Sequence, residues 1–290
     1  MVWLKGSLGW HLRALQVAFK FIRSPAYSEI SGAFPLHLPE LDIETLATPQ
    51  QLSKMLARIE GAWTHLGQVR PHFSVLTQNE FLPENIGGSI DRFWATGELE
   101  ADVAAFVLSR CGFSDLAQKT CVEYGCGVGR VTIPLAGRFA EVHAYEISPS
   151  YIALAQQRAE AMMAGNIRFH SCAGGLPDRL ESCDFFYSRL VFQHNPPPII
   201  RELIGRALGS LRPGGIALFG VPIYLSGYRF QIEEYLAQQR RGLEMHCIPQ
   251  REVFSLIAAA QCAVLELREE RDAGMEGLGN LFVVQRSAHR

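Results

Sequence analysis

The sequence of 290 residues contains no uncharged apolar run of 18 residues or more, so it predicts no membrane-spanning helix. Its seven cysteines include no C-x-x-C pair and its nine histidines form no H-x-x-x-H or H-E-x-x-H group, so we predict no metal site. Scattered cysteines of odd number, in a chain too large to need disulfides, are typical of a reducing compartment, and we expect a cytoplasmic protein. The formal net charge of -2 gives no electrostatic reason to expect a nucleic-acid partner.

Acidic residues are also missing before Glu29, where the sequence has the pattern of a basic amphipathic helix. Apolar side chains recur there at helical spacing, at Leu8, Leu12, Leu15, Phe19 and Ile22. We expect this helix to pack on its own domain or on a partner subunit, as in a homodimer. The alternatives are an organelle transit peptide and peripheral contact of residues 5–23 with anionic lipid. A signal peptide is disfavoured because Arg13 and Lys20 interrupt the apolar stretch.

The chain changes character near residue 85. Residues 1–85 are punctuated by prolines and predict helices and loops, as in PQQLSKMLARIEGAWTHLG. In residues 86–290, a helix that ends at Gly112 is followed by alternating strand and helix signals. One of these helices is predicted to begin at Ser148-Pro149 and to end at Gly165-Asn166. We therefore predict a helical N-terminal extension (1–85) that could serve as a lid, dimer or surface-binding element, followed by one α/β domain (86–290).

Five predicted strands in this domain alternate with helical or loop segments: TCVEY, EVHAYEI, IRFHS, DFFYSRL and IALFGV. Such alternation favours right-handed crossovers around a parallel sheet. The last two apolar runs, AVLELREERD and NLFVVQR, leave no room for a helix between them and predict an antiparallel hairpin. The predicted fold is therefore α/β and Rossmann-like, with a mostly parallel seven-stranded sheet that ends in a C-terminal antiparallel hairpin.

A glycine-rich segment, CVEYGCGVGR at residues 121–130, directly follows the first predicted strand. Glycines at alternate positions (Gly125, Gly127 and Gly129) would let a ligand approach the main chain at the carboxyl end of that strand. A dinucleotide fingerprint, G-x-G-x-x-G, would place its third glycine at position 130, which is Arg130. The dinucleotide pattern therefore fails.

The segment VEYGCGVGR resembles motif I of the class I S-adenosylmethionine-dependent methyltransferases, small-molecule type, and the resemblance extends over roughly residues 90–290. DFFYSRLVFQH and LRPGGIALF are similar to that family's fourth strand and fifth-strand entry. The resemblance implies S-adenosyl-L-methionine as cofactor. It places the cofactor contacts at Tyr124, Gly125, Cys126, Gly127, Gly129, Arg130, Glu146, Ile147, Ala173, Gly174, Ser188 and Arg189.

Individual roles also come from the resemblance. Glu146 ends the second strand, where the family carries an acidic residue that bonds both ribose hydroxyls. The family's acidic residue after the third strand is absent from SCAGGLP, so adenine recognition would rest on backbone groups near Ala173 and Gly174 with packing from Ile147. Arg130 could reach the cofactor carboxylate or simply solvate the helix start, and both interpretations stay open.

The resemblance implies methyl transfer to an oxygen or nitrogen of a small molecule such as a sugar or secondary metabolite. Residues 222–250 follow the fifth strand, where the family often builds a substrate lid. Their aromatic and basic residues fit a lid or an ordinary amphipathic helix: Tyr224, Tyr228, Arg229, Phe230, Tyr235, Arg240 and Arg241. The alternatives to a methyltransferase are an NAD- or nucleotide-binding oxidoreductase and a non-catalytic binding subunit.

His194 is the candidate catalytic residue, because it follows the fourth strand in the loop that faces the transferred methyl group in this family. Imidazole titrates near neutrality and could take a proton from the acceptor. The alternative is a structural histidine that bonds the loop or caps the helix near Asn195. Direct displacement mainly requires alignment of the reacting atoms, so a general base is not essential.

Overall fold

The computed structural model describes residues 40–238, 242–270 and 277–288. The expected N-terminal amphipathic helix and two members of the lid set, Arg240 and Arg241, lie outside the described residues. The chain divides into two compact units, residues 1–41 and 42–290, and the second is described below. This boundary differs from the expected one at residue 85, because the helices of residues 49–75 pack on the sheet domain.

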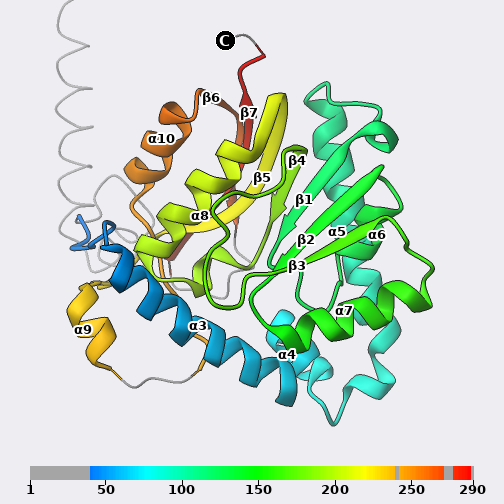
Figure 1. Cartoon of the computed structure of the whole chain (residues 1–290), viewed down its shortest axis with the longest axis horizontal. Helices are drawn as coiled ribbons and strands as arrows, with labels where there is room; N and C mark the ends of the chain where they lie inside the picture. Colours follow the sequence, from blue (N-terminus) through cyan, green and yellow to red (C-terminus); the bar gives the residue numbers. More distant parts are fainter. Residues whose placement is uncertain (1–39, 239–241, 271–276, 289–290) are drawn as a thin grey trace, which may run out of the picture. The chain divides into compact units, whose positions relative to one another are not determined.

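Seven strands form one sheet with the order β3-β2-β1-β4-β5-β7-β6 (Figure 1). The first five are parallel to one another: β1 (Thr120–Tyr124), β2 (Glu141–Glu146), β3 (Ile167–Ser171), β4 (Cys183–Ser188) and β5 (Leu211–Leu225). The remaining pair, β6 (Cys262–Glu270) and β7 (Gly277–Arg286), is antiparallel, and β7 also pairs antiparallel with β5. The predicted fold class, with its parallel strands and terminal hairpin, is confirmed.

Helices cover both faces of the sheet. On one face, α3 (Pro49–Val69), α8 (Pro197–Ser210), α9 (Ile232–Ala237) and α10 (Gln250–Ala259) share an apolar core with strand residues such as Phe186 and Phe219. On the other, α5 (Ile90–Arg110), α6 (Thr132–Ala136) and α7 (Pro149–Ala161) contribute to a core that contains Phe185 and Val142. The central strands β1, β4 and β5 are largely buried on both faces, which explains their apolar composition, whereas the edge strands β3 and β6 are partly exposed.

The helix α3 closes the carboxyl end of the sheet. It begins with a capping box, in which the Thr48 hydroxyl and the Gln51 side chain each accept from the other's backbone N–H. Figure 1 shows α3 lying beside α7 and α9. Contact with α7 is close, because a Cβ at Gly67 would lie 2.4 Å from the Ser150 Oγ. The short helix α4 (Pro71–Val75) continues from α3.

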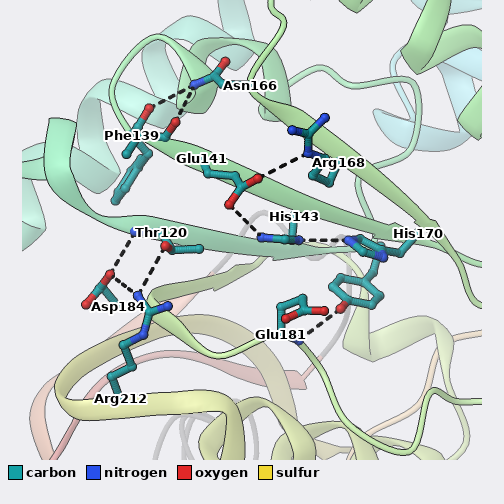
Figure 2. A network of polar contacts seen from close by, with 12 residues as sticks. Thr120, Phe139, Glu141, His143, Asn166, Arg168, His170, Glu181, Asp184 and Arg212 are labelled. Carbon is teal, nitrogen blue, oxygen red and sulfur yellow. Dashed lines mark hydrogen bonds and ion pairs between the residues drawn. The ribbon is translucent and has the colours of Figure 1, made fainter.

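Polar contacts tie together the opposite, amino-terminal ends of the strands (Figure 2). The Thr120 N–H donates to Asp184 Oδ2 at 2.8 Å, and Arg212 donates to the same oxygen at 2.7 Å. The Asn166 amide donates to the Phe139 carbonyl at 3.0 Å. Ligands of open parallel sheets bind beyond the carboxyl ends of the strands, so a ligand is expected at the edge opposite to these contacts.

Helix ends follow the sequence closely but not exactly. Gly112 has φ +74° and caps α5 as predicted. The helix α7 ends at Ala161, before the predicted Gly165, because Met163 takes the left-handed conformation with φ +55°. No helix of the described ranges is both long and apolar enough to cross a membrane.

Candidate ligand-binding site

The glycine loop between β1 and α6 is left-handed at all three glycines, with φ values of +80°, +54° and +84° at Gly125, Gly127 and Gly129. Side chains of neighbouring segments also approach this loop closely. A Cβ at Gly125 would lie 2.4 Å from the Val191 Cγ2, and one at Gly127 would lie 3.0 Å from Val75. Glycine is therefore required here by both backbone conformation and space.

The carboxylate of Glu146 links this loop to the end of β2. Its Oε2 accepts from the Gly127 N–H at 2.9 Å, and its Oε1 accepts from the N–H groups of Ile147 and Ser148 at 2.8 and 3.0 Å. Burial raises the pKa of Glu146, while the three backbone donors oppose that shift. The two donors occupy both lone pairs of Oε1, so Oε2, with a single donor, can still accept a hydrogen bond from a ligand.

A cavity opens beyond the carboxyl ends of β1, β2 and β4. Eight of the twelve residues expected to contact a cofactor line it: Tyr124, Gly125, Cys126, Gly127, Arg130, Glu146, Ile147 and Arg189. The site expected from the sequence is therefore largely gathered around one cavity.

Four of the expected residues are absent from this lining. Gly129 packs against Ala155, and the Ser188 hydroxyl donates to the Tyr124 carbonyl at 2.9 Å. Ala173 and Gly174 are exposed in the loop after β3, and the Gly174 N–H donates to Glu60 of α3 at 2.7 Å. These residues support the walls of the cavity or lie outside it.

Several lining residues were not expected from the sequence. The helices α3 and α4 supply Ile59, Trp63, Ser74 and Val75, while Glu100, Glu123, Tyr151 and Tyr187 come from other elements. Only Glu123 had a local signal, because it is the acidic residue two positions before the first glycine of the loop. The others approach the cavity through tertiary packing, which local spacing does not reveal.

Charged groups cluster at one end of the cavity. Arg130 pairs with Glu100 at 2.6 Å, and Arg189 pairs with Glu100 at 3.4 Å and with Glu270 at 2.8 Å. The Tyr187 hydroxyl also donates to Glu100. Burial alone would raise the pKa of Glu100, but the two guanidinium groups outweigh it and lower that pKa.

Glu123 lies in the same cavity and differs from Glu100. Glu123 is only 4% exposed. Burial raises the pKa of Glu123 to about 7, and the positive charge of Arg130 opposes this shift. The carboxyl group of Glu123 is therefore close to half-protonated at neutral pH.

His194 is placed differently from its expected role as a base. It does not line this cavity, its Nδ1 donates to the Glu244 carbonyl at 2.9 Å, and its ring meets the Trp63 ring edge-on at 5.1 Å. Burial lowers the pKa of His194 to about 4, well below the neutral range expected for a free imidazole. This arrangement favours the structural alternative.

A second cavity lies between α3 and the segment after β5. It is lined by Arg58, Tyr228, Phe230, Tyr235, Glu244 and His246, among others. The Arg58 guanidinium stacks over the Tyr235 ring at 4.0 Å and pairs with Glu244. The Tyr228 hydroxyl and the His246 Nδ1 share a hydrogen bond of 2.7 Å. Arg229, another member of the expected lid set, also lines this cavity and pairs with Asp42 and Glu234. Tyr224 lies elsewhere, paired with Leu278 inside the sheet.

Comparisons with known proteins match this chain to methyltransferases. Residues 121–215 match the family model described as a methyltransferase domain. The chain is 34% identical over 101 residues to trans-aconitate 2-methyltransferase from Deinococcus radiodurans, covering 35% of this chain and 37% of that protein. It is 27% identical over 171 residues to malonyl-[acyl-carrier protein] O-methyltransferase from Paenibacillus sp., covering 56% of this chain and 59% of that protein. These matches span less than two thirds of either relative.

A crystal structure of magnesium protoporphyrin IX methyltransferase from Synechocystis with bound S-adenosylmethionine has the same fold. The TM-score is 0.55 at 16% identity, over 84% of this chain and 100% of that one. The fold and the glycine loop are those of a Rossmann-like methyltransferase domain. The family model, the curated relatives and the shared fold together support the class I S-adenosylmethionine-dependent methyltransferase superfamily for this chain.

The raised pKa of Glu123 predicts a pH dependence of stability in the ligand-free protein. The folded state holds this proton up to about pH 7, whereas the unfolded chain releases it near the ordinary value of 4.5. The stabilising contribution is therefore complete below that value and is lost as the pH rises through about 7. Relative to Glu123→Gln, the wild-type free energy of unfolding should fall by about 3 kcal/mol across this window. Urea unfolding of both proteins over the window measures it, and a constant difference would contradict it.

Proposed function

We propose that this chain transfers a methyl group from S-adenosyl-L-methionine to an oxygen of a small molecule. The observation that carries the proposal is the buried Glu146 carboxylate bonded to the glycine loop at the edge of a cavity. The free lone pair of its Oε2 can accept from a hydroxyl of a vicinal diol such as that of a ribose. The cavity is lined by hydrogen-bond acceptors such as Glu146 and by donors such as Arg130. S-adenosyl-L-methionine, a nucleoside that carries an amino acid, offers both donors and acceptors to such groups.

The residues of the chain would have distinct tasks in this reaction. Glu146 would hold the ribose, and Ile147 would pack against the base. Trp63, Val75 and Val191 form apolar walls that would exclude water. The cofactor supplies an activated methyl group on a sulfonium, so the protein mainly has to align donor and acceptor.

A carboxylate is the acceptor group that fits best. Both curated relatives named above act on molecules that carry carboxylates, trans-aconitate and a malonyl group. A carboxylate is ionised at neutral pH and needs no general base. This agrees with a His194 whose pKa is lowered to about 4 and whose Nδ1 is bound to a carbonyl. A hydroxyl or nitrogen acceptor, with His194 or another group as base, is the second candidate.

We further infer that the second cavity, with residues 222–238 and 242–250, receives the acceptor. Trp63 lines the first cavity and contacts His194, which in turn bonds to Glu244 of the second cavity. The two cavities are thus neighbours across one histidine. The aromatic rings of Tyr228, Phe230 and Tyr235 would provide an apolar wall for the acceptor.

S-adenosylhomocysteine should raise the melting temperature of the protein, whereas NAD should not. A ligand that binds only the native state stabilises it by mass action. Differential scanning fluorimetry with each compound measures this. Stabilisation by NAD but not by S-adenosylhomocysteine would instead favour an oxidoreductase.

Glu146→Ala should weaken binding of S-adenosylhomocysteine by roughly 10- to 150-fold, because it removes the acceptors for the ribose hydroxyls. Glu141→Ala, at the opposite end of the same strand and outside the cavity, is the matched control and should bind normally. Isothermal titration calorimetry gives both dissociation constants. Equal affinity in the two variants would show that the ribose does not contact Glu146.

Label transferred from methyl-labelled S-adenosylmethionine should end up in an alkali-labile product. A methyl ester of a carboxylate hydrolyses in mild alkali and releases methanol, whereas a methyl ether or methylamine retains the label. Incubation with trans-aconitate, a malonyl thioester, a polyol and an amine compares the acceptor classes directly. Label that is transferred but survives alkali would exclude the carboxylate and favour the second candidate.

A further inference from the structure

The Arg and Glu side chains of the second cavity are already paired with one another. Of the side chains that line it within the described residues, four are of these types: Arg58, Arg229, Glu234 and Glu244. Arg58 pairs with Glu244, and Arg229 pairs with Glu234 at 2.8 Å. An ionic group of a ligand would find no spare countercharge among them, and burial of an unpaired charge is costly. The cavity is therefore suited to a neutral part of a ligand.

A chain of hydrogen bonds between three side chains runs along the wall of this cavity. The Glu244 Oε2 lies 3.4 Å from the His246 Nε2, and the His246 Nδ1 lies 2.7 Å from the Tyr228 hydroxyl. Burial alone would raise the pKa of Glu244, but hydrogen bonds from His246, Tyr235 and Arg58 outweigh it and lower that pKa. Glu244 is thus ionised at neutral pH.

The ionised carboxylate fixes the direction of each hydrogen bond in this chain. A carboxylate only accepts, so the His246 Nε2 carries a hydrogen. In a neutral imidazole the other nitrogen then accepts, so the Tyr228 hydroxyl donates to Nδ1. Burial raises the pKa of Tyr228, which keeps that hydroxyl protonated. Because its one hydrogen points to His246, the Tyr228 oxygen can only accept a hydrogen bond from a ligand.

Two further features of the wall favour a hydroxylated ring as the ligand. The Arg58 Nε is buried and has no hydrogen-bond partner within the described part of the chain. Hydroxyl groups both donate and accept, so they can serve the Tyr228 oxygen and the Arg58 Nε, whereas an ether or a carboxylate offers Tyr228 no donor. The rings of Phe230 and Tyr235 line the cavity, each with its centroid 5.7 Å from that of His246. Such a wall suits a flat ring.

We propose that the second cavity selects an acceptor that carries a neutral hydroxylated ring away from its methyl-accepting group, and that the Tyr228 oxygen accepts a hydrogen bond from the hydroxyl of that ring. His246 and Glu244 are positioning residues, because they direct the Tyr228 hydrogen to Nδ1. This inference rests on the proposed function, since it names the class of acceptor that the second cavity would receive. It also goes further, because it predicts discrimination between a hydroxyl, an ether and a carboxylate.

Three probes of similar size test this selectivity. Phenol carries a hydroxyl donor, anisole replaces it with a methyl ether, and benzoate carries a carboxylate instead. Ligand-observed NMR titrations at about pH 8, where a free imidazole is neutral, give the dissociation constants, with S-adenosylhomocysteine added to fill the first cavity. The wild type should bind phenol about 3- to 10-fold more tightly than anisole or benzoate, the range expected for one hydrogen bond.

Tyr228→Phe removes the accepting oxygen and should bind phenol and anisole with affinities within about 2-fold of each other. Tyr224→Phe is the matched control, because Tyr224 lies in the sheet outside the cavity, and it should keep the preference of the wild type. A preference for phenol that survives in Tyr228→Phe would show that another group contacts the hydroxyl, and it would overturn the inference.

Glu244→Gln separates a positioning role from a merely structural one. A glutamine amide can donate to the His246 Nε2, which moves the imidazole hydrogen to Nδ1 and frees the Tyr228 hydroxyl to donate. This variant should therefore lose the preference for phenol over anisole. A structural Glu244 would weaken both probes equally, and an unchanged ratio would overturn the positioning role of Glu244 and His246.

The wild-type comparison needs no variant to fold. Equal affinity for phenol and anisole, tighter binding of benzoate, or no binding of any probe at millimolar concentration would overturn the inference. Titration of S-adenosylhomocysteine alone distinguishes this outcome from failure of the proposed function. If that compound does not bind, the proposed function falls, whereas the probe ratios test the second cavity with or without it.

Discussion

The hydrogen bonds of the Glu146 carboxylate hold together the parts of the molecule on which the site depends. One oxygen accepts from Gly127 in the glycine loop, and the other accepts from Ile147 and Ser148 at the start of α7. The helix α3 then packs against that start, at the contact of Gly67 with Ser150. A single buried carboxylate thus connects two strand ends, the loop and, through α7, the helix that closes the cavity. Its burial is tolerated because three backbone donors compensate it.

The two ends of the first cavity differ in polarity, and this difference fits the methyl transfer proposed above. The charged end, with Glu100, Arg130 and Arg189, is suited to orient a ligand. Apolar residues from α3 and α4 form another part of the wall, and Trp63 there contacts His194. His194 bonds in turn to the segment that lines the second cavity. Orientation at one end and exclusion of water at the other suit a reaction governed by alignment.

Local patterns in the sequence were sufficient for the sheet and for the centre of the site. Each strand contains a short apolar run that can be recognised alone, although β5 (Leu211–Leu225) extends well beyond its predicted run IALFGV. The terminal hairpin follows from two such runs with no helix between them. The glycine spacing and Glu146 are likewise adjacent to strands, so their meeting at the carboxyl edge follows from parallel pairing of β1 with β2. The end of α7 differs from the predicted Gly165, because Met163 adopts a left-handed backbone conformation that glycine or asparagine usually takes.

The sequence by itself therefore determined the α/β fold, the glycine loop and the acidic group beside it, since these depend on neighbours along the chain. Only the tertiary structure decided which distant residues complete the site. Trp63 and Glu100 reach the cavity because whole helices pack there, and no spacing in the sequence records that approach. The pKa values of Glu123 and His194 were also beyond the sequence. Burial sets both, and burial depends on every element that surrounds the group.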